Sequence, residues 1–222
     1  MKISIAPDVF VKFPQLKVGL LVASNVDNKS KLARSTHLLH DAQRMVQLTF
    51  NKDSVRSHYL ISPWTAAQQE FGKKAIHYHT CVERLLDDTL EKKPVAEKDV
   101  GTNLMRYLSL KYVVPLGVDD ARKIQGDISF HISKIGSEKE LVYADQKSVL
   151  GKKLDYWQSP RTRPAANSTA LLVHLEALPP LTNRKVREIL VELQSLIYTF
   201  CGGKTKIVLL HRRKPSVQLS IF

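Results

Sequence analysis

Histidine and cysteine residues are the first candidates for metal ligands or nucleophiles in this chain of 222 residues, which has 8 His and 2 Cys. His37 and His40 lie one helical turn apart and could share a metal ion, but no Glu or third ligand accompanies them. Cys81 and Cys201 are far apart and lack CxxC spacing, which excludes a disulfide framework or a zinc finger. Cys201 precedes two glycines at an expected helix end, where a small buried side chain is usual. We therefore expect neither a metal site nor a thiol nucleophile.

No short catalytic motif is present. The chain lacks a GxSxG elbow, a P-loop, a GxGxxG fingerprint and an HExxH pair, so nucleotide hydrolysis and dehydrogenase chemistry are not expected, and no cofactor is indicated. Hydrolysis of an already activated ester stays open, because a site that aligns one water against the carbonyl can act by positioning and backbone donors alone.

The charge of the chain is strongly positive. There are 34 Lys+Arg against 21 Asp+Glu, a net charge of +13 and a pI near 9.7. From residue 151 onward the count is 12 Lys+Arg against 4 Asp+Glu, so the excess is concentrated in the last third. A polyanion is the natural partner for such a chain, although dispersed basic groups are also compatible with ordinary surface solvation.

Residues 107–128 hold several backbone-constraining residues between two apolar segments. Leu104, Leu108 and Tyr112 recur at helical spacing, and Pro115 then removes a backbone donor. Gly117 and Gly126 are expected to supply positive φ angles before an alternating strand at 128–132. The segment predicts a helix end, a tight corner and a return into a strand.

This corner carries a family resemblance. The segment SLKYVVPLGVDDARKIQGDI resembles the PLG-x-x-D-x-x-K-I-x-G-D-I signature of the B3/B4 domain, the editing module of the phenylalanyl-tRNA synthetase β subunit and of freestanding homologues. Three further segments follow the family's order: KISIAPDVFVKFPQLKVGLLVASNVDN, LVYADQKSVLGKKLDYWQSPRTR and NSTALLVHLEAL. The resemblance spans nearly the whole chain and implies an α/β (α+β) fold with mixed sheets and flanking helices.

The resemblance implies an amino-acid pocket between residues 115–117 and the segment YWQSPRTRPAANST. Thr162 and Ser168 match the family's hydroxyl positions, where they could bind substrate or water or could instead cap strand ends. Asp120 matches the Asp after PLG and is expected to hold the turn. Trp157 is expected beside the pocket. The pocket residues so implied are Asn103, Arg106, Tyr107, Pro115, Leu116, Gly117, Thr162, Ser168 and Thr169.

Two departures from the family pattern put its substrate in question. Where the family has Asp and Asn upstream of the corner, this chain has Asn103 and Arg106. The first change removes a carboxylate and the second adds a cation. The Gly-Gly of the editing loop is replaced by Gln158-Ser159-Pro160. RNA binding with altered or lost hydrolysis is therefore compatible with the sequence.

Three functions follow as hypotheses. The first is a freestanding aminoacyl-tRNA editing hydrolase that deacylates mischarged tRNA in trans; the second is a non-catalytic tRNA- or RNA-binding module; the third acts on small amino-acid derivatives. The expected partner is the aminoacylated 3′ end of tRNA, with neither DNA nor membrane, and a homodimer is possible. The residues expected to bind RNA are Arg161, Arg163, Arg212, Arg213 and Lys214.

At 222 residues the chain can bury a sizeable core as one domain or as two small ones, and we expect one domain over residues 1–222. A cytoplasmic location is expected, because the N-terminus lacks the apolar region of a secretory signal. Helices are expected from Asn28 or Ser30 to about 50, from 62, over 82–90 and 100–112, and from a cap at Thr182 or Asn183 to Gly202. Strands are expected near 2–5, 17–22, 128–132, 140–144, 154–157, 170–175, 206–210 and 216–219.

Overall fold

The computed structural model describes residues 1–69, 79–135, 138–152 and 159–220. Helices and strands alternate along most of the chain. In order they are β1 (Lys2–Ile5), α1 (Pro7–Lys12), β2 (Lys17–Ser24), α2 (Leu32–Thr49), the 3-10 helix η1 (Lys52–Ser54), α3 (Ser62–Gln69), α4 (Cys81–Leu90), α5 (Val100–Tyr112), β3 (Leu116–Asp120), the 3-10 helix η3 (Ala121–Lys123), β4 (Ile128–Ile135), β5 (Glu138–Ala144), β6 (Val149–Lys152), β7 (Ala170–Ala177), α6 (Asn183–Cys201), β8 (Lys204–His211) and β9 (Ser216–Gln218).

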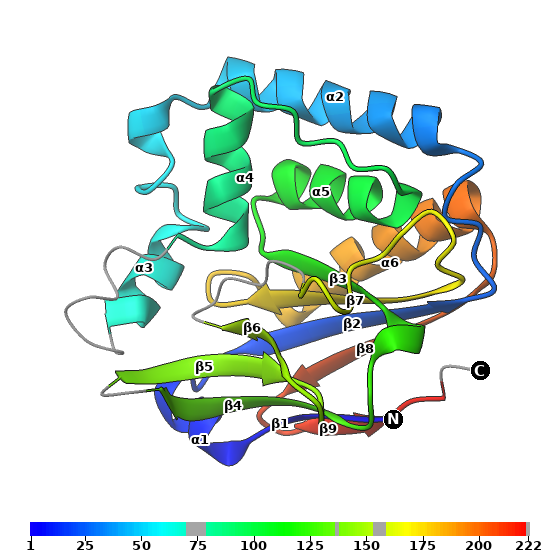
Figure 1. The fold of residues 1–222 in the computed structure, drawn as a ribbon. Helices are drawn as coiled ribbons and strands as arrows, with labels where there is room; N and C mark the ends of the chain where they lie inside the picture. Colours follow the sequence, from blue (N-terminus) through cyan, green and yellow to red (C-terminus); the bar gives the residue numbers. More distant parts are fainter. Residues whose placement is uncertain (70–78, 136–137, 153–158, 221–222) are drawn as a thin grey trace.

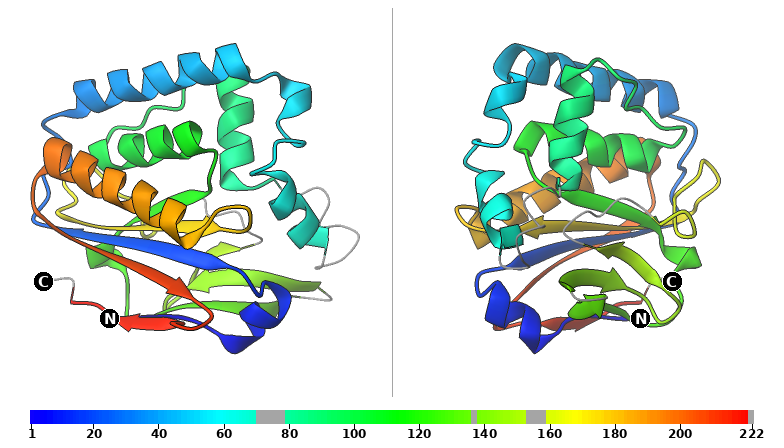
Figure 2. Two further views of the ribbon diagram at one scale, coloured as in Figure 1. Left: turned by 180° about the vertical axis from the view of Figure 1, so that it is seen from behind. Right: turned by 60° about the vertical axis from the view of Figure 1, so that its left-hand side comes forward.

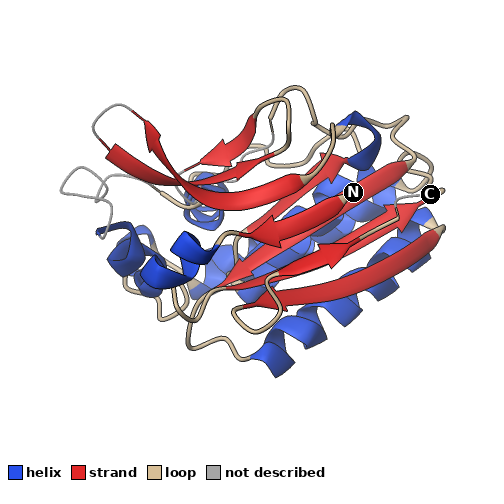
Figure 3. Ribbon diagram, turned by 90° about the horizontal axis from the view of Figure 1, so that it is seen from below, coloured by secondary structure: helices blue, strands red, loops and turns tan. Residues whose placement is uncertain are grey.

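The strands form two sheets, which confirms the expected mixed α/β fold. One sheet has the order β6-β5-β4-β1-β9 and contains a parallel pair, β1 with β4. The other has the order β3-β7-β2-β8 and is antiparallel throughout. The sheets form two layers, and the long helices lie on the far side of the four-stranded sheet (Figure 1). Figure 3 shows the strands in front of the helices when the molecule is seen from below.

Both faces of the four-stranded sheet are buried. The helix-side face packs against α5 and α6, and Figure 2 shows α6 lying along this sheet from behind. The opposite face packs against the five-stranded sheet, with Phe130 and Leu141 among the contributors from that layer. Because side chains alternate along a strand, β7 sends Val173 and Leu175 to the helices and His174 and Glu176 to the space between the sheets.

A third apolar cluster joins α2, α4 and α5. Two large apolar residues of α2 face solvent, since Met45 is 59% exposed and Leu48 is 81% exposed. The buried stripe of this helix includes Leu39 and Val46. The expected caps of α2 are wrong, since the residue before it is Lys31 and makes no side-chain cap. Asn28 instead binds residues of other segments.

The corner after α5 forms as expected from the sequence except at Gly117, whose backbone angle differs. Helix α5 ends at Val113, which has a left-handed φ of 53°, and Ser109 donates from its hydroxyl to the carbonyl of Val114 at 2.7 Å. Gly117 lies within β3 and has no positive φ, so the expected role of this glycine is wrong. Gly126 does have the expected positive φ, at 73°.

Most other expected elements are confirmed, including β2, and α6 with its Thr182 cap and Gly202 end. The sequence did not predict α1, β3 or β6. The expected strand at 154–157 and the Trp157 side chain lie outside the described residues. Among the residues that the structure does describe, no helix is long and apolar enough to cross a membrane.

Candidate functional site

Five polar side chains meet between the two sheets, and we call them the inter-sheet cluster: Asp119, Tyr143, Thr162, His174 and Glu176. Thr162 donates from its hydroxyl to Asp119 Oδ1 at 2.5 Å, and the Tyr143 hydroxyl donates to Asp119 Oδ2 at 2.8 Å. His174 donates from Nδ1 to Glu176 Oε1 at 2.6 Å, and its Nε2 lies 3.9 Å from Asp119 Oδ2. The imidazole therefore stands between two carboxylates.

Strand pairing brings these residues together. In the register of β3 with β7, Gly117 is opposite His174 and Asp119 is opposite Leu172, so Asp119 and His174 project from the same face of the sheet. A Cβ atom on Gly117 would lie 2.2 Å from His174 Nε2, so the absence of a side chain there makes room for the imidazole. The Gly117 constraint is thus close approach rather than backbone angle.

Aromatic rings pack around the imidazole. The Tyr143 ring centroid is 4.5 Å from that of His174, and Phe130 meets His174 edge-on at 6.3 Å. No member of the inter-sheet cluster is more than 2% exposed. Five polar side chains are therefore held in a nearly water-free space, where hydrogen bonds and charges act more strongly than at the surface.

Burial and the neighbouring carboxylates act in opposite directions on His174. Burial disfavours the imidazolium, but the charges of Glu176 and Asp119 outweigh it and raise the pKa of His174. Burial raises the pKa of Asp119, against the effect of His174 and of the two hydroxyl donors. Glu176 Oε2 is buried without a hydrogen-bond partner among the described residues. The cluster thus combines a proton donor, His174, with an oxygen free to accept a proton or a hydrogen bond.

Residues 159–169, which we call the cover segment, close one side of the cluster. Its Thr162 bonds Asp119 as described, and its Ser168 donates to Asp120 Oδ2 at 2.6 Å. Backbone also joins the two segments, since the Asp120 N–H donates to the Thr162 carbonyl at 2.7 Å. Thr162 and Ser168 are both buried, so their hydroxyls are engaged with carboxylates of the protein itself.

The remaining pocket residues expected from the sequence lie in three places: at the start of β3, at Thr169 and on α5. Pro115, Leu116 and Gly117 are buried where β3 begins, within a few residues of the inter-sheet cluster, whereas Thr169 is exposed. The other three lie on α5, where Tyr107 is half-buried between apolar clusters. The α5 residues are Asn103, Arg106 and Tyr107.

Asn103 and Arg106 fasten the segment that precedes α5. Asn103 accepts from the Glu97 N–H at 2.7 Å and donates to the Ser35 hydroxyl of α2 at 3.3 Å. Arg106 donates to the Val95 carbonyl and forms an ion pair with Glu97 at 2.9 Å. These contacts explain both side chains structurally, and none of them joins a residue of the inter-sheet cluster.

The basic residues expected to bind RNA differ in their contacts within the protein and in their exposure. Arg161 donates to Asp145 Oδ2 at 2.5 Å, to the Lys123 carbonyl at 2.7 Å and to the Ser148 hydroxyl at 3.2 Å, so its guanidinium ties the cover segment to η3 and to the β5–β6 turn. Arg163 is exposed. The basic hairpin between β8 and β9 is exposed as well and carries Arg212, Arg213 and Lys214.

Sequence reasoning missed four members of the inter-sheet cluster: Asp119, Tyr143, His174 and Glu176. A signal was present in ALLVHLEA of β7, where every residue is buried although two are ionisable. Ionisable side chains in a strand that is otherwise apolar are buried with it and therefore require polar partners from other segments. His174 and Glu176 in this strand thus indicated a buried polar cluster.

Other reactive groups lie elsewhere. Cys201 is buried, and burial raises the pKa of its thiol to about 12, so the thiolate needed for nucleophilic attack is scarce at neutral pH. His37 and His40 are exposed on α2. No group of three or more His, Cys, Asp or Glu in the described part of the chain could hold a metal ion.

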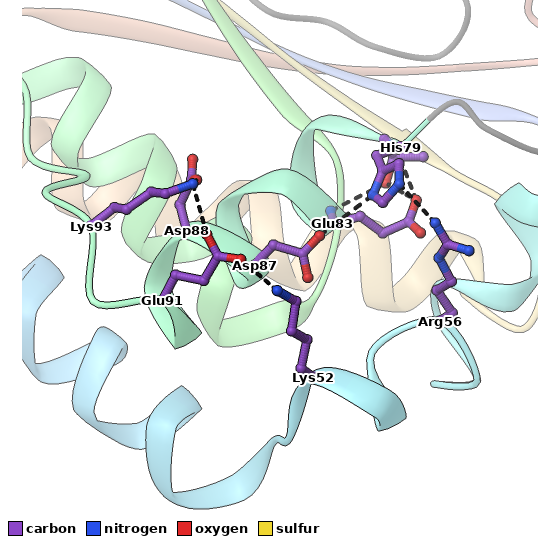
Figure 4. A network of polar contacts seen from close by, with 9 residues as sticks. Lys52, Arg56, His79, Glu83, Asp87, Asp88, Glu91 and Lys93 are labelled. Carbon is purple, nitrogen blue, oxygen red and sulfur yellow. Dashed lines mark hydrogen bonds and ion pairs between the residues drawn. The ribbon is translucent and has the colours of Figure 1, made fainter.

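A second polar network lies on α4 and the segment before it (Figure 4). Glu91 pairs with Lys52 at 2.5 Å and with Lys93 at 2.7 Å, and His79 pairs with Asp87 at 3.4 Å. The side chains of the Glu91 pairs are 36–66% exposed. Exposed ion pairs of this kind are screened by solvent and contribute little to stability, and we assign them a role in fastening η1 to the end of α4.

Comparisons with known proteins leave the family unassigned. No protein-family model matches the chain, and no curated protein matches it. The inter-sheet cluster and the charge of the chain are therefore the features from which a function can be inferred.

Proposed function

We propose that this protein is a freestanding aminoacyl-tRNA hydrolase that releases a mischarged amino acid in trans, with the inter-sheet cluster as its reaction centre. The observation that carries the proposal is His174 held between the carboxylates of Glu176 and Asp119, beside the junction of β3 with the cover segment. The resemblance to the B3/B4 domain supplies the substrate class, and the net charge of +13 suits a nucleic acid.

The cluster contains the groups that ester hydrolysis needs. Glu176 takes a proton from water through Oε2, and the resulting hydroxide adds to the ester carbonyl. When the acyl C–O bond breaks, the His174 imidazolium gives a proton to the departing ribose oxygen. Because Nδ1 keeps its proton in the 2.6 Å contact with Glu176, the proton given away comes from Nε2. Glu176 has then gained one proton and His174 has lost one, so release of a proton from Glu176 to water and uptake of another at Nε2 restore the ion pair.

Substrate access requires the cover segment to move. His174 is 2% exposed, and the contacts that hold the segment in place include Thr162 with Asp119, Ser168 with Asp120 and Arg161 with Asp145. Deacylation thus depends on breaking polar contacts of the cover segment when tRNA binds.

A second candidate is a tRNA-binding module without hydrolytic activity. It is favoured by the engagement of Thr162 and Ser168 with carboxylates of the protein, which leaves neither hydroxyl free for substrate in this state. Both candidates share tRNA binding and differ in release of the amino acid.

A panel of mischarged tRNAs separates the two candidates. Under the first proposal, wild-type protein releases the amino acid from at least one of them above the spontaneous rate, and Glu176→Gln abolishes this release without weakening tRNA binding. Binding without release for every ester supports the second candidate. Absence of tRNA binding contradicts both.

A further inference from the structure

We propose that the surface where α2 begins and α6 ends binds single-stranded RNA next to the cover segment. This inference rests on the proposed function, because it names the surface through which that RNA would be held. We call it the α2–α6 patch, and it consists of Lys29, Lys31, Arg34, Tyr198, Phe200 and Lys204.

Segments far apart in the sequence meet at this patch. Lys31 Nζ donates to the Thr199 carbonyl at 2.6 Å, and the Asp27 N–H donates to the Cys201 carbonyl at 2.8 Å. Lys204 begins β8 and pairs with Ser24 at the end of β2. The start of α2, the end of α6 and the start of β8 therefore lie side by side (Figure 1).

The patch is positively charged. Residues 25–34 and 198–206 together contain five Lys or Arg and a single acid, Asp27. The Asp27 carboxylate accepts the N–H groups of Lys29 and Ser30 at 3.0 Å each, so it is directed to its own backbone. Hydrogen bonds from Ser30 lower its pKa to about 2. A net positive surface of this kind attracts phosphates and releases their counterions on binding.

Two aromatic side chains lie at this end of α6. Tyr198 is 71% exposed, which is unusual for a large ring on a helix whose other face is packed. Arg34 stands over the Phe200 ring, 5.7 Å from its centroid. Cations and an exposed ring at one helix end are suited to unpaired nucleotides, because phosphates meet the cations and a base stacks on the ring.

The patch adjoins the cover segment directly. Asn28, one residue before Lys29, donates to the Ala165 carbonyl at 2.8 Å, and the Val26 N–H donates to the Thr169 carbonyl at 3.0 Å. The basic β8–β9 hairpin is at the other end of β8, about 23 Å away at ~3.3 Å per residue. An RNA strand bound to the α2–α6 patch is therefore next to the cover segment, which closes the inter-sheet cluster. An RNA strand bound to the hairpin would lie at the opposite end of β8.

Two variants with equal loss of charge test the inference. Lys29→Gln/Lys31→Gln/Arg34→Gln removes three cations from the patch, and Arg212→Gln/Arg213→Gln/Lys214→Gln removes three from the hairpin. We expect the patch variant to bind uncharged tRNA and a single-stranded oligoribonucleotide at least about tenfold more weakly near 0.1 M salt, with a log–log salt slope lower by about 0.7 per lost contact. The hairpin variant is expected to change affinity less than about threefold. Circular dichroism and thermal unfolding confirm that both variants are folded.

A third variant tests the stacking contact. Tyr198→Leu is expected to weaken binding of the oligoribonucleotide about fivefold or more, and to leave binding of an abasic oligonucleotide of equal length unchanged.

Three results would overturn the inference. The first is that wild type binds tRNA and the patch variant binds it with equal affinity, which leaves the proposed function intact. The second is equal weakening by the patch and hairpin variants, which indicates only net charge. The third is absence of RNA binding by wild type, which removes the proposed function as well.

Discussion

The two faces of β7 show how differently one strand can be used. On the helix side, Val173 and Leu175 pack into an aliphatic layer with residues of α5 and α6, such as Leu104 and Leu190. On the inter-sheet side, His174 and Glu176 are buried just as completely, at 2% and 0% exposed. Both faces of β7 are buried, but only the inter-sheet face carries ionisable side chains.

This difference separates stability from chemistry. Burial of aliphatic side chains stabilises the fold by about 25 cal/mol per Å² of apolar surface. Burial of ionisable groups removes their hydration, and a buried ion pair often stabilises less than apolar residues of similar volume would. The helix-side face therefore accounts for stability, and the inter-sheet face carries groups whose presence calls for a functional explanation.

The largest effect is expected from removing the cation between the two carboxylates. His174→Leu leaves Glu176 and Asp119 buried without it, and should lower the free energy of unfolding by about 3–5 kcal/mol. Urea unfolding measures this loss. A variant within about 1 kcal/mol of wild type would show that the two faces of β7 are energetically alike.

The same pair of proteins has a defined pH dependence. The folded-state pKa of His174 is raised above the unfolded value of about 6.5, so the stability from its charged form is fully present below that pH and is lost as pH rises through the folded pKa. The stability difference between wild type and His174→Leu should therefore shrink above about pH 6.5.

The next effect concerns the attachment of the cover segment. Arg161→Ala removes the charged partner of Asp145, whose side chain is 0% exposed, and should lower stability by about 1.5–3 kcal/mol. Burial opposes ionisation of Asp145, but the Gln125 N–H and the Arg161 guanidinium outweigh it and lower its pKa. The contribution is present above the unfolded pKa of about 3.9 and is lost as pH falls through the folded pKa. Unfolding measured near neutral pH and again in acid checks it, since a difference that stays constant would contradict the ion pair.

A smaller effect is expected at Gly117. A methyl group there would lie 2.2 Å from His174 Nε2, and the imidazole is held by Glu176, so Gly117→Ala should lower stability by about 1–3 kcal/mol. A double-mutant cycle identifies the cause. In a His174→Ala background the effect of Gly117→Ala should vanish; a persistent effect would mean that backbone strain is responsible instead.

The smallest effect is expected at an exposed apolar residue of α2, and a buried leucine of the same helix serves as its control. Leu48 is 81% exposed, so Leu48→Ser should change stability by no more than about 0.5 kcal/mol. Leu39 on the same helix is 0% exposed, and Leu39→Ala should cost about 2–5 kcal/mol. Similar losses for the two variants would show that Leu48 is covered in solution.

The sequence predicted the elements whose signals are local. Helix α6 was predicted because Thr182 caps it, Gly202 ends it and its apolar positions recur at helical spacing. The strand LGVDD of β3 was not predicted, because two consecutive Asp residues are typical of turns and only pairing with β7 makes this segment a strand.

The candidate site was predictable only in part for the same reason. The sequence indicated the corner at 115–117 and the hydroxyls of Thr162 and Ser168, which bond the neighbouring Asp119 and Asp120. It did not indicate His174 and Glu176, because their importance depends on Asp119 and Tyr143, which come from other strands. Contacts between distant strands are tertiary information that a linear pattern does not contain.

The most direct test of the functional account replaces the charged groups of the inter-sheet cluster together. In Asp119→Asn/His174→Leu/Glu176→Leu, none of the cluster's charges stays buried, and the amide introduced at position 119 can still meet the hydroxyls of Thr162 and Tyr143. We predict stability equal to wild type or up to about 4 kcal/mol higher, with unchanged tRNA binding and no release of amino acid from any mischarged tRNA that wild type deacylates. A stable triple variant that still releases the amino acid at the wild-type rate would contradict the account.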